Sequence, residues 1–203
     1  MGNIVLYICL IAFLMIACSE EEKQAGKERE IEQQDISDNR IKKVSRHFLK
    51  AVKNNDFEAI AGMIHPEKGT RFSPYAYVDT SKHVRLMPDE FREAYGSDEV
   101  FTWGTYDGVG GPIELTLNEY FKEFVYDRDF LNAPKVSIEE SIASGNMINN
   151  IEDIYPRAKY IEYYFPGERR QFKGLDWRAL RLVFDEYKGE PKLIALIHSQ
   201  WTI

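Results

Sequence analysis

The sequence predicts a fold of the α+β class, because its helical and strand-forming segments occupy separate regions of the chain. Apolar residues recur with the helical period in two segments between residues 41 and 64 and in a third after residue 116, whereas roughly the last thirty residues favour strands. Of the 203 residues, 44% are hydrophobic and 29% are charged, which is typical of a globular protein. The formal net charge is −7, and we expect no nucleic-acid partner because such proteins carry a basic face.

The N-terminus carries an apolar run over residues 4–17 that contains no charged residue. A helix that spans a bilayer needs about twenty such residues, whereas the core of an export signal needs about 7–15. The run ends in Ala17-Cys18 and polar residues follow it, a pattern that resembles the signal of bacterial lipoproteins. The resemblance implies that residues 1–17 are a signal peptide and that Cys18 carries the lipid. It also implies a protein anchored to a membrane of the bacterial cell envelope, outside the cytoplasm.

An uncleaved N-terminal anchor helix is the alternative for residues 4–17, and it implies the same location. Cys9 lies in this run and Cys18 is the lipid site, so the remaining chain has no thiol for a disulfide, a nucleophile or a metal site. Residues 18–36 contain many charged and few apolar residues, which predicts an acidic, flexible tether. A charged helical stalk is the alternative for this segment.

Three helices are predicted in the region from residue 37 onward. The first has apolar residues at helical spacing over 41–52 and ends at the two asparagines before Asp56. Asp56 is a good N-cap for the second helix, which ends before Pro66. Thr116 and Glu119 form a capping box for the third.

Strands are predicted where β-branched and aromatic residues cluster between turn signals. In chain order they are residues 72–78, 84–86, 101–106, 159–165, 177–187 and 192–201, with a helical turn at 88–95. The last two strands predict a long antiparallel hairpin, in which Gly189-Glu190 fits the loop of a type II′ turn.

This register places Arg181 opposite His198, the most polar cross-strand pair in a strongly apolar region. Trp177, Gln200 and Trp201 flank the pair, so these five residues are the predicted ligand-binding residues. Arginine would offer a fixed cation to an anionic group, and the tryptophans would offer apolar walls. Two alternatives are open for this face of the hairpin: it lines a pocket, or it faces solvent as a mixed polar face often does.

The order of elements resembles the NTF2-like (SnoaL-like) fold, in which N-terminal helices pack on a curved antiparallel sheet that forms a cone with a pocket. The stretch FLKAVKNNDFEAIAGMIHP is similar to its opening helices, and WRALRLVFDEY and KLIALIHSQWTI are similar to its closing strands. FSPYAYVD, WGTYDG and HSQWTI are similar to phrases in uncharacterised bacterial lipoproteins of this type. The resemblance covers residues 37–203 and implies a single domain.

We therefore expect a non-catalytic module that binds a small ligand in an aromatic-lined pocket. One alternative is an isomerase or dehydratase of the kind known on this fold, with a pocket Asp, His or Tyr as its base. The other is a protein-interaction module that forms a homodimer through its sheet. The membrane, through the lipid, and a small-molecule or protein ligand are the expected partners.

No catalytic residue, metal site or cofactor is predicted from the motifs. The glycines at 108, 110 and 111 lack the Lys-Ser/Thr of a phosphate-binding loop. Asp127-Arg128-Asp129 is interpreted as an acidic helix end with its own arginine partner rather than as a calcium site. The sequence contains neither HExxH nor GxSxG.

Overall fold

The computed structural model describes residues 27, 30, 33–35, 37–108, 110–143, 145 and 148–202. It divides into two units, Met1–Arg40 and Ile41–Ile203, which we describe separately. In the first unit the described residues are helical. The predicted signal peptide and Cys18 lie outside the described residues. Within the described part of the chain, no helix has the length and apolar character needed to cross a membrane.

The helices of the second unit begin and end at the signals that predict them. The first runs to residue 53 and stops at the two asparagines. Asp56 then caps α2 (Phe57–Met63) by accepting a hydrogen bond from the amide of Ala59 at 3.1 Å. The capping box of Thr116 and Glu119 opens α4 (Leu117–Tyr120), which continues as the π-helix η1 (Phe121–Val125). The predicted helical turn is a two-turn helix, α3 (Pro88–Tyr95).

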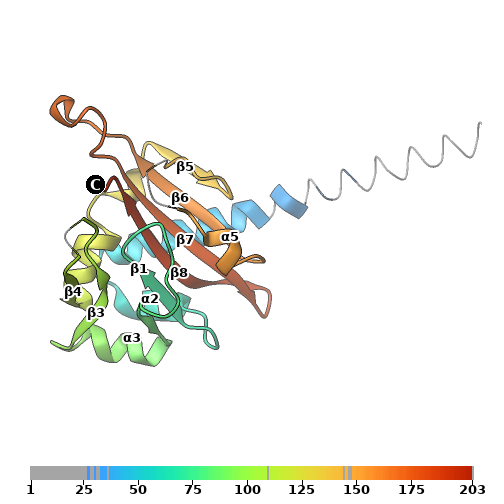
Figure 1. Ribbon diagram of the computed structural model, residues 1–203. Coiled ribbons are helices and arrows are strands. Elements are labelled where there is room, and N and C mark those ends of the chain that lie inside the picture. Colours follow the sequence, from blue (N-terminus) through green and yellow to red (C-terminus); the bar gives the residue numbers. More distant parts are fainter. Residues whose placement is uncertain are drawn as a thin grey trace, which may run out of the picture. The chain divides into compact units, whose positions relative to one another are not determined.

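Six strands form one sheet in the order β2-β1-β8-β7-β6-β5 (Figure 1). Their bounds are β1 (Thr70–Ser73), β2 (Arg85–Leu86), β5 (Lys135–Ile138), β6 (Lys159–Phe165), β7 (Arg178–Tyr187) and β8 (Glu190–Gln200). β1 runs parallel to β8 while the other neighbours are antiparallel, so the sheet is mixed and the prediction of an antiparallel sheet is wrong in this respect. A separate hairpin pairs β3 (Val100–Thr105) with β4 (Pro112–Thr116).

Short helical segments complete the fold. These are η2 (Phe130–Asn132), α5 (Ile151–Ile154) and η3 (Arg170–Phe172). β4, β5 and α5 are not among the elements that the sequence predicts.

The hairpin of β7 and β8 differs from its predicted register in two places. Tyr187 pairs with Glu190, so the loop is Lys188-Gly189 instead of Gly189-Glu190. Both loop residues have positive φ, 52° and 80°, which is the signature of a type I′ turn. Farther along, Val183 pairs with the residue at 195 but its neighbour at 184 pairs with the residue at 193, which leaves Ile194 as a β-bulge.

The sheet is covered on both faces. Its helix-facing side carries Leu180, Leu182 and Leu193, which pack in the main core with aromatic residues of the helices and of the β3–β4 hairpin. The opposite side, here called the outer face, carries Val183, Ala195, Ile197 and Tyr160. That cluster is covered by Val78 and by Ile151 of α5. The central strands therefore expose neither face, and a mixed polar face in solvent is absent from this part of the described structure.

Candidate functional site

The register separates the five predicted ligand-binding residues onto two faces of the sheet. Arg181 pairs with Ile197, and His198 pairs with Leu180. Because neighbouring residues of a strand point to opposite faces, Arg181 lies on the outer face and His198 on the helix-facing side. The prediction that Arg181 and His198 are cross-strand neighbours is therefore wrong. The outer face also holds Trp177, packed in a small cluster with Trp201, whereas Gln200 shares the side of His198.

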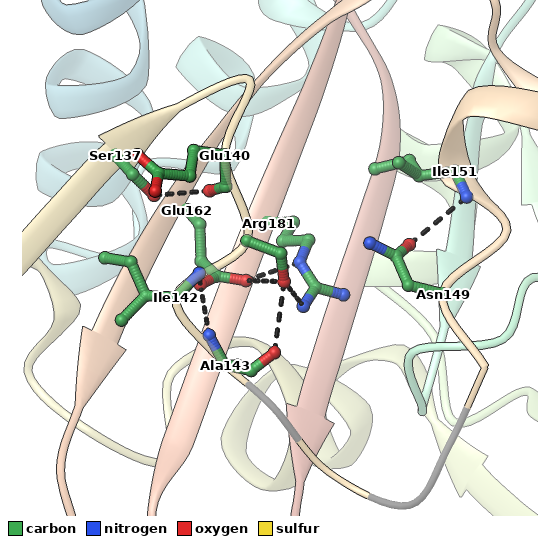
Figure 2. Close-up of polar contacts among 9 residues, drawn as sticks. Ser137, Glu140, Ile142, Ala143, Asn149, Ile151, Glu162 and Arg181 are labelled. Carbon is green, nitrogen blue, oxygen red and sulfur yellow. Dashed lines mark hydrogen bonds and ion pairs between the residues drawn. The ribbon is translucent and has the colours of Figure 1, made fainter.

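Arg181 is the centre of a buried polar network that Figure 2 shows beneath the loop after β5. Its Nε donates to Oε2 of Glu162 at 2.5 Å, and its Nη2 donates to Oγ of Ser141 at 2.7 Å. The other carboxylate oxygen of Glu162 accepts hydrogen bonds from the amides of Ile142 and Ala143 at 2.6 and 2.8 Å. The side chains of Arg181 and Glu162 are 1% and 0% exposed.

This network holds the loop on the sheet rather than presenting a charge to a ligand. The carboxylate of Glu162 neutralises the guanidinium of Arg181, and the loop amides take up the remaining acceptor capacity of that carboxylate. Neither alternative for Arg181, pocket or solvent, describes its position: it is enclosed by protein.

A cavity of about 420 Å³ lies on the helix-facing side, near one end of β7 and β8. We call it the Asp127 pocket. Its lining combines aromatic rings with charged and amide groups: Tyr75, Tyr106, Glu123, Phe124, Asp127, Arg128, Arg178 and Gln200. Of the predicted residues, Gln200 lines it and His198 lies directly behind Phe124 and Asp127.

The π-helix η1 brings three of these side chains to the pocket. At its end the amide of Tyr126 donates to the carbonyl of Phe121 at 2.8 Å, a hydrogen bond to the residue five positions earlier instead of the four of an α-helix. The wider turn changes the direction of the residues around it, which include Glu123, Phe124 and Asp127. π-Helical turns occur frequently at functional sites.

Asp127 joins the two central strands at the floor of the pocket. Nε of Arg178 on β7 donates to Oδ2 of Asp127 at 2.9 Å. Nε2 of His198 on β8 lies 3.5 Å from the same oxygen, and its Nδ1 lies 3.3 Å from the carbonyl of Pro74. Since a carbonyl can only accept, Nδ1 of His198 carries a proton. The ring of His198 is 1% exposed and meets the ring of Phe124 edge to face.

One oxygen of Asp127 has no hydrogen-bond partner within the described structure. Burial alone would raise the pKa of Asp127, but the hydrogen bonds and charges of His198 and Arg178 outweigh it and lower that pKa. The group is therefore a carboxylate at neutral pH. Its Oδ1 is buried and has no hydrogen-bond partner among the described residues. A buried carboxylate oxygen without a donor is costly, so this carboxylate is held at a cost in folding free energy.

The tyrosines of the pocket remain hydrogen-bonding phenols at neutral pH. Burial raises the pKa of Tyr75. Burial, and to a smaller extent the charge of Glu123, raises the pKa of Tyr106. The hydroxyl of Tyr75 accepts a hydrogen bond from the amide of Asp107 at 3.3 Å, which fixes the phenol at the rim. The pocket thus offers donors and acceptors between aromatic faces.

Sequence reasoning missed Asp127, Arg178 and Glu123 as pocket residues. Asp127 was interpreted as part of an acidic helix end paired with its own Arg128, but its partner is Arg178 on a distant strand. Asp129, the other carboxylate of that motif, pairs with Lys53. No local pattern connects residues 127 and 178, since only the packing of η1 on the sheet brings them together. Within the part of the chain that the structure describes, no group of three or more His, Cys, Asp or Glu side chains could hold a metal ion.

Comparison with known proteins adds no assignment. No protein-family model matches the chain, and no curated protein matches it either. The cavity and its side chains are therefore the basis for the functional proposal that follows.

Proposed function

We propose that this chain is a lipoprotein of the bacterial cell envelope, anchored outside the cytoplasm through Cys18, whose folded part binds a small ligand in the Asp127 pocket without transforming it. The lipoprotein part of the proposal is supported by the short apolar run that ends in Ala17-Cys18. An NTF2-like cone is supported by the element order and by helices that pack on one side of a six-stranded mixed sheet.

The observation that carries the binding proposal is the cavity of about 420 Å³ itself, whose lining combines aromatic rings with the carboxylate of Asp127. Aromatic rings of Tyr75, Tyr106 and Phe124 form the apolar wall, and Gln200 adds a neutral amide. Glu123 and Asp127 oppose Arg128 and Arg178, so the charges of the lining balance. A molecule without net charge, with an apolar face and hydroxyl groups, fits this lining best, as a small glycan or a neutral amphiphile would.

An isomerase or dehydratase is the second candidate, and the pair of His198 and Asp127 is the observation that favours it. A histidine beside a carboxylate in a cavity is an arrangement used for general acid–base catalysis. However, the ring of His198 packs against Phe124, and its Nε2 lies 3.5 Å from the carboxylate of Asp127. The ring is 1% exposed, so it does not reach the open cavity. Binding is therefore the better-supported function.

Native mass spectrometry tests the proposal directly. The full-length protein should be purified from its own host in a non-ionic detergent, and its mass compared with that of the denatured chain. We expect a retained small molecule in the wild type and its loss in Tyr106→Ala. Tyr77→Ala is the matched control, because Tyr77 is 48% exposed and does not line the pocket.

The same measurement distinguishes the alternatives. A released molecule that the fresh protein leaves chemically unchanged supports binding, whereas its conversion supports the enzyme. A stable dimer without any ligand, unaffected by Tyr106→Ala, supports the interaction module and overturns the binding proposal.

A further inference from the structure

A second cavity, on the outer face of the sheet, gathers cationic side chains in a protein whose net charge is −7. It has a volume of about 370 Å³ and shares no lining residue with the Asp127 pocket. Lys68, Arg71, Arg85 and Arg157 line it, together with one carboxylate, that of Asp185. We call this cavity the basic groove.

The four cations come from separate parts of the fold. Lys68 follows α2, Arg71 lies in β1 and Arg85 lies in β2. Arg157 lies in the turn between α5 and β6. Tertiary folding is therefore required to bring these like charges together, and their mutual repulsion opposes the arrangement unless an anion is present.

Two of the arginines are held in place by neutral acceptors. Nη1 of Arg71 donates to the carbonyls of Thr80 and His83 at 3.0 and 2.7 Å. Nη1 of Arg85 donates to the carbonyl of Lys68 at 3.2 Å. These bonds orient the guanidinium groups but leave their charge uncompensated, so part of the ordering entropy of binding is already lost in the free protein.

The single carboxylate of the groove is occupied by the lysine. Asp185 forms an ion pair with Lys68, which leaves the three arginines. Among the described residues, no carboxylate forms an ion pair with Arg71, Arg85 or Arg157. The groove therefore presents three guanidinium groups that no acidic side chain of the described structure neutralises.

We propose that the basic groove is a binding site for a phosphoryl group. Guanidinium groups match phosphate and carboxylate oxygens by paired hydrogen bonds. Three guanidinium groups that line one cavity offer more donors than the two oxygens of one carboxylate accept, which favours a tetrahedral phosphoryl group. Ile154, Pro156 and Ile194 form an apolar side of the groove, so the phosphoryl group belongs to a larger molecule whose body rests there.

Two sources carry this chemistry, a soluble phosphate ester and the headgroup of a phospholipid. Full-length protein in a non-ionic detergent should first be titrated with glycerol 3-phosphate by calorimetry at constant ionic strength, because salt screens such contacts. In a second arm, phosphatidic acid is added to the same micelles, with phosphatidylcholine micelles as the comparison. Saturable binding in the first arm identifies a soluble ester, and binding only to phosphatidic acid micelles identifies a headgroup.

The variant Arg85→Gln/Arg157→Gln tests the site itself, since both side chains are exposed and the folded state should tolerate their change. Losing two charge-assisted contacts should weaken binding by about tenfold or more. Arg169→Gln is the matched control, an exposed arginine outside the groove, and should leave the affinity unchanged. Three results overturn the proposal: no saturable binding in either arm, equal binding by the double variant, or equal affinity for succinate.

Discussion

Replacing Glu162 by glutamine tests the claim that a buried ion pair holds the loop over residues 141–143 on the sheet. The amide keeps the size of the side chain and can still accept from the backbone, but it removes the charge that neutralises Arg181. Breaking a buried pair by removing one partner costs about 3–5 kcal/mol, because the other charge is left in a low dielectric. With both side chains at most 1% exposed, water cannot replace the lost partner without unfolding the loop.

We expect Glu162→Gln to lower the free energy of unfolding by about 3 kcal/mol or more. Each kcal/mol lowers Tm by about 2–4 °C in a domain of this size, so the midpoint should fall by at least about 6 °C. Urea unfolding followed by tryptophan fluorescence measures the first quantity. Glu58→Gln is the control, since Glu58 pairs with Arg92 at the surface with a side chain 77% exposed, and it should unfold like the wild type.

The double variant Glu162→Gln/Arg181→Met separates the ion pair from simple packing. It leaves no buried charge, so most of the lost stability should return. A loss below about 1 kcal/mol in Glu162→Gln would refute the reasoning. A double variant that is as unstable as the sum of the single variants would refute it as well, because the two residues would then not be coupled.

The remaining predictions concern a histidine, a turn and the anchor. Burial lowers the pKa of His83 to about 4, and its Nδ1 accepts from the amide of Asp79, so the folded state favours the neutral ring. The contribution of His83 to the free energy of unfolding is complete above pH 6.5 and is lost as the pH falls toward 4. His83→Gln should therefore remove about 1–2 kcal/mol of the pH dependence of stability in that window, as measured by urea unfolding at a series of pH values. An unchanged dependence of the unfolding free energy on pH would contradict this. Gly189→Ala should lower the free energy of unfolding in urea by about 1 kcal/mol, because the φ of Gly189 is +80°. Gly62→Ala is the control and should not destabilise, because Gly62 lies in a helix with open space around it. Equal effects of the two changes would argue against the turn geometry. Cys18→Ala should abolish labelling by a fatty-acid analogue, and persistent labelling would exclude this residue as the lipid site.

Local signals predicted the helices well. Asp56 and the pair of Thr116 and Glu119 satisfy free amides at helix starts, and such caps act within three residues. Strand β6 was predicted with the observed bounds because Lys159–Phe165 is a dense run of strand-forming residues. In contrast, β5 consists of only four residues, too few for a recognisable alternation, and it pairs with the edge of β6.

The pocket could not be predicted in the same way. Asp127 and Arg178 meet because η1 packs against the end of β7, and the π-turn that aims Asp127 has no recognisable sequence signature here. His198 was identified as a polar residue in an apolar strand, which is a valid signal for a buried polar contact, but its partner was misassigned.

The misassignment has a single physical cause, and it is the bulge rather than the turn. The turn moves from Gly189-Glu190 to Lys188-Gly189, which shifts every partner by two residues and keeps each side chain on its face. With that shift alone, Arg181 and His198 would still share a face. The extra residue Ile194 reduces the difference between the predicted and the observed register from two residues to one. A difference of one residue places the side chains of the remaining strand on the opposite face.

Strand alternation cannot reveal such a bulge where both faces are buried. Around Ile194 the residues from Leu193 to Ile197 are all apolar and all buried, so no polar residue marks which side is which. The bulge sends His198 to the Asp127 pocket and leaves Arg181 to pair with Glu162, and Ile194 itself lines the basic groove. One inserted residue thus determines which face of the sheet His198 occupies, and deleting Ile194 should exchange the faces of the residues that follow it, removing His198 from the side of Asp127.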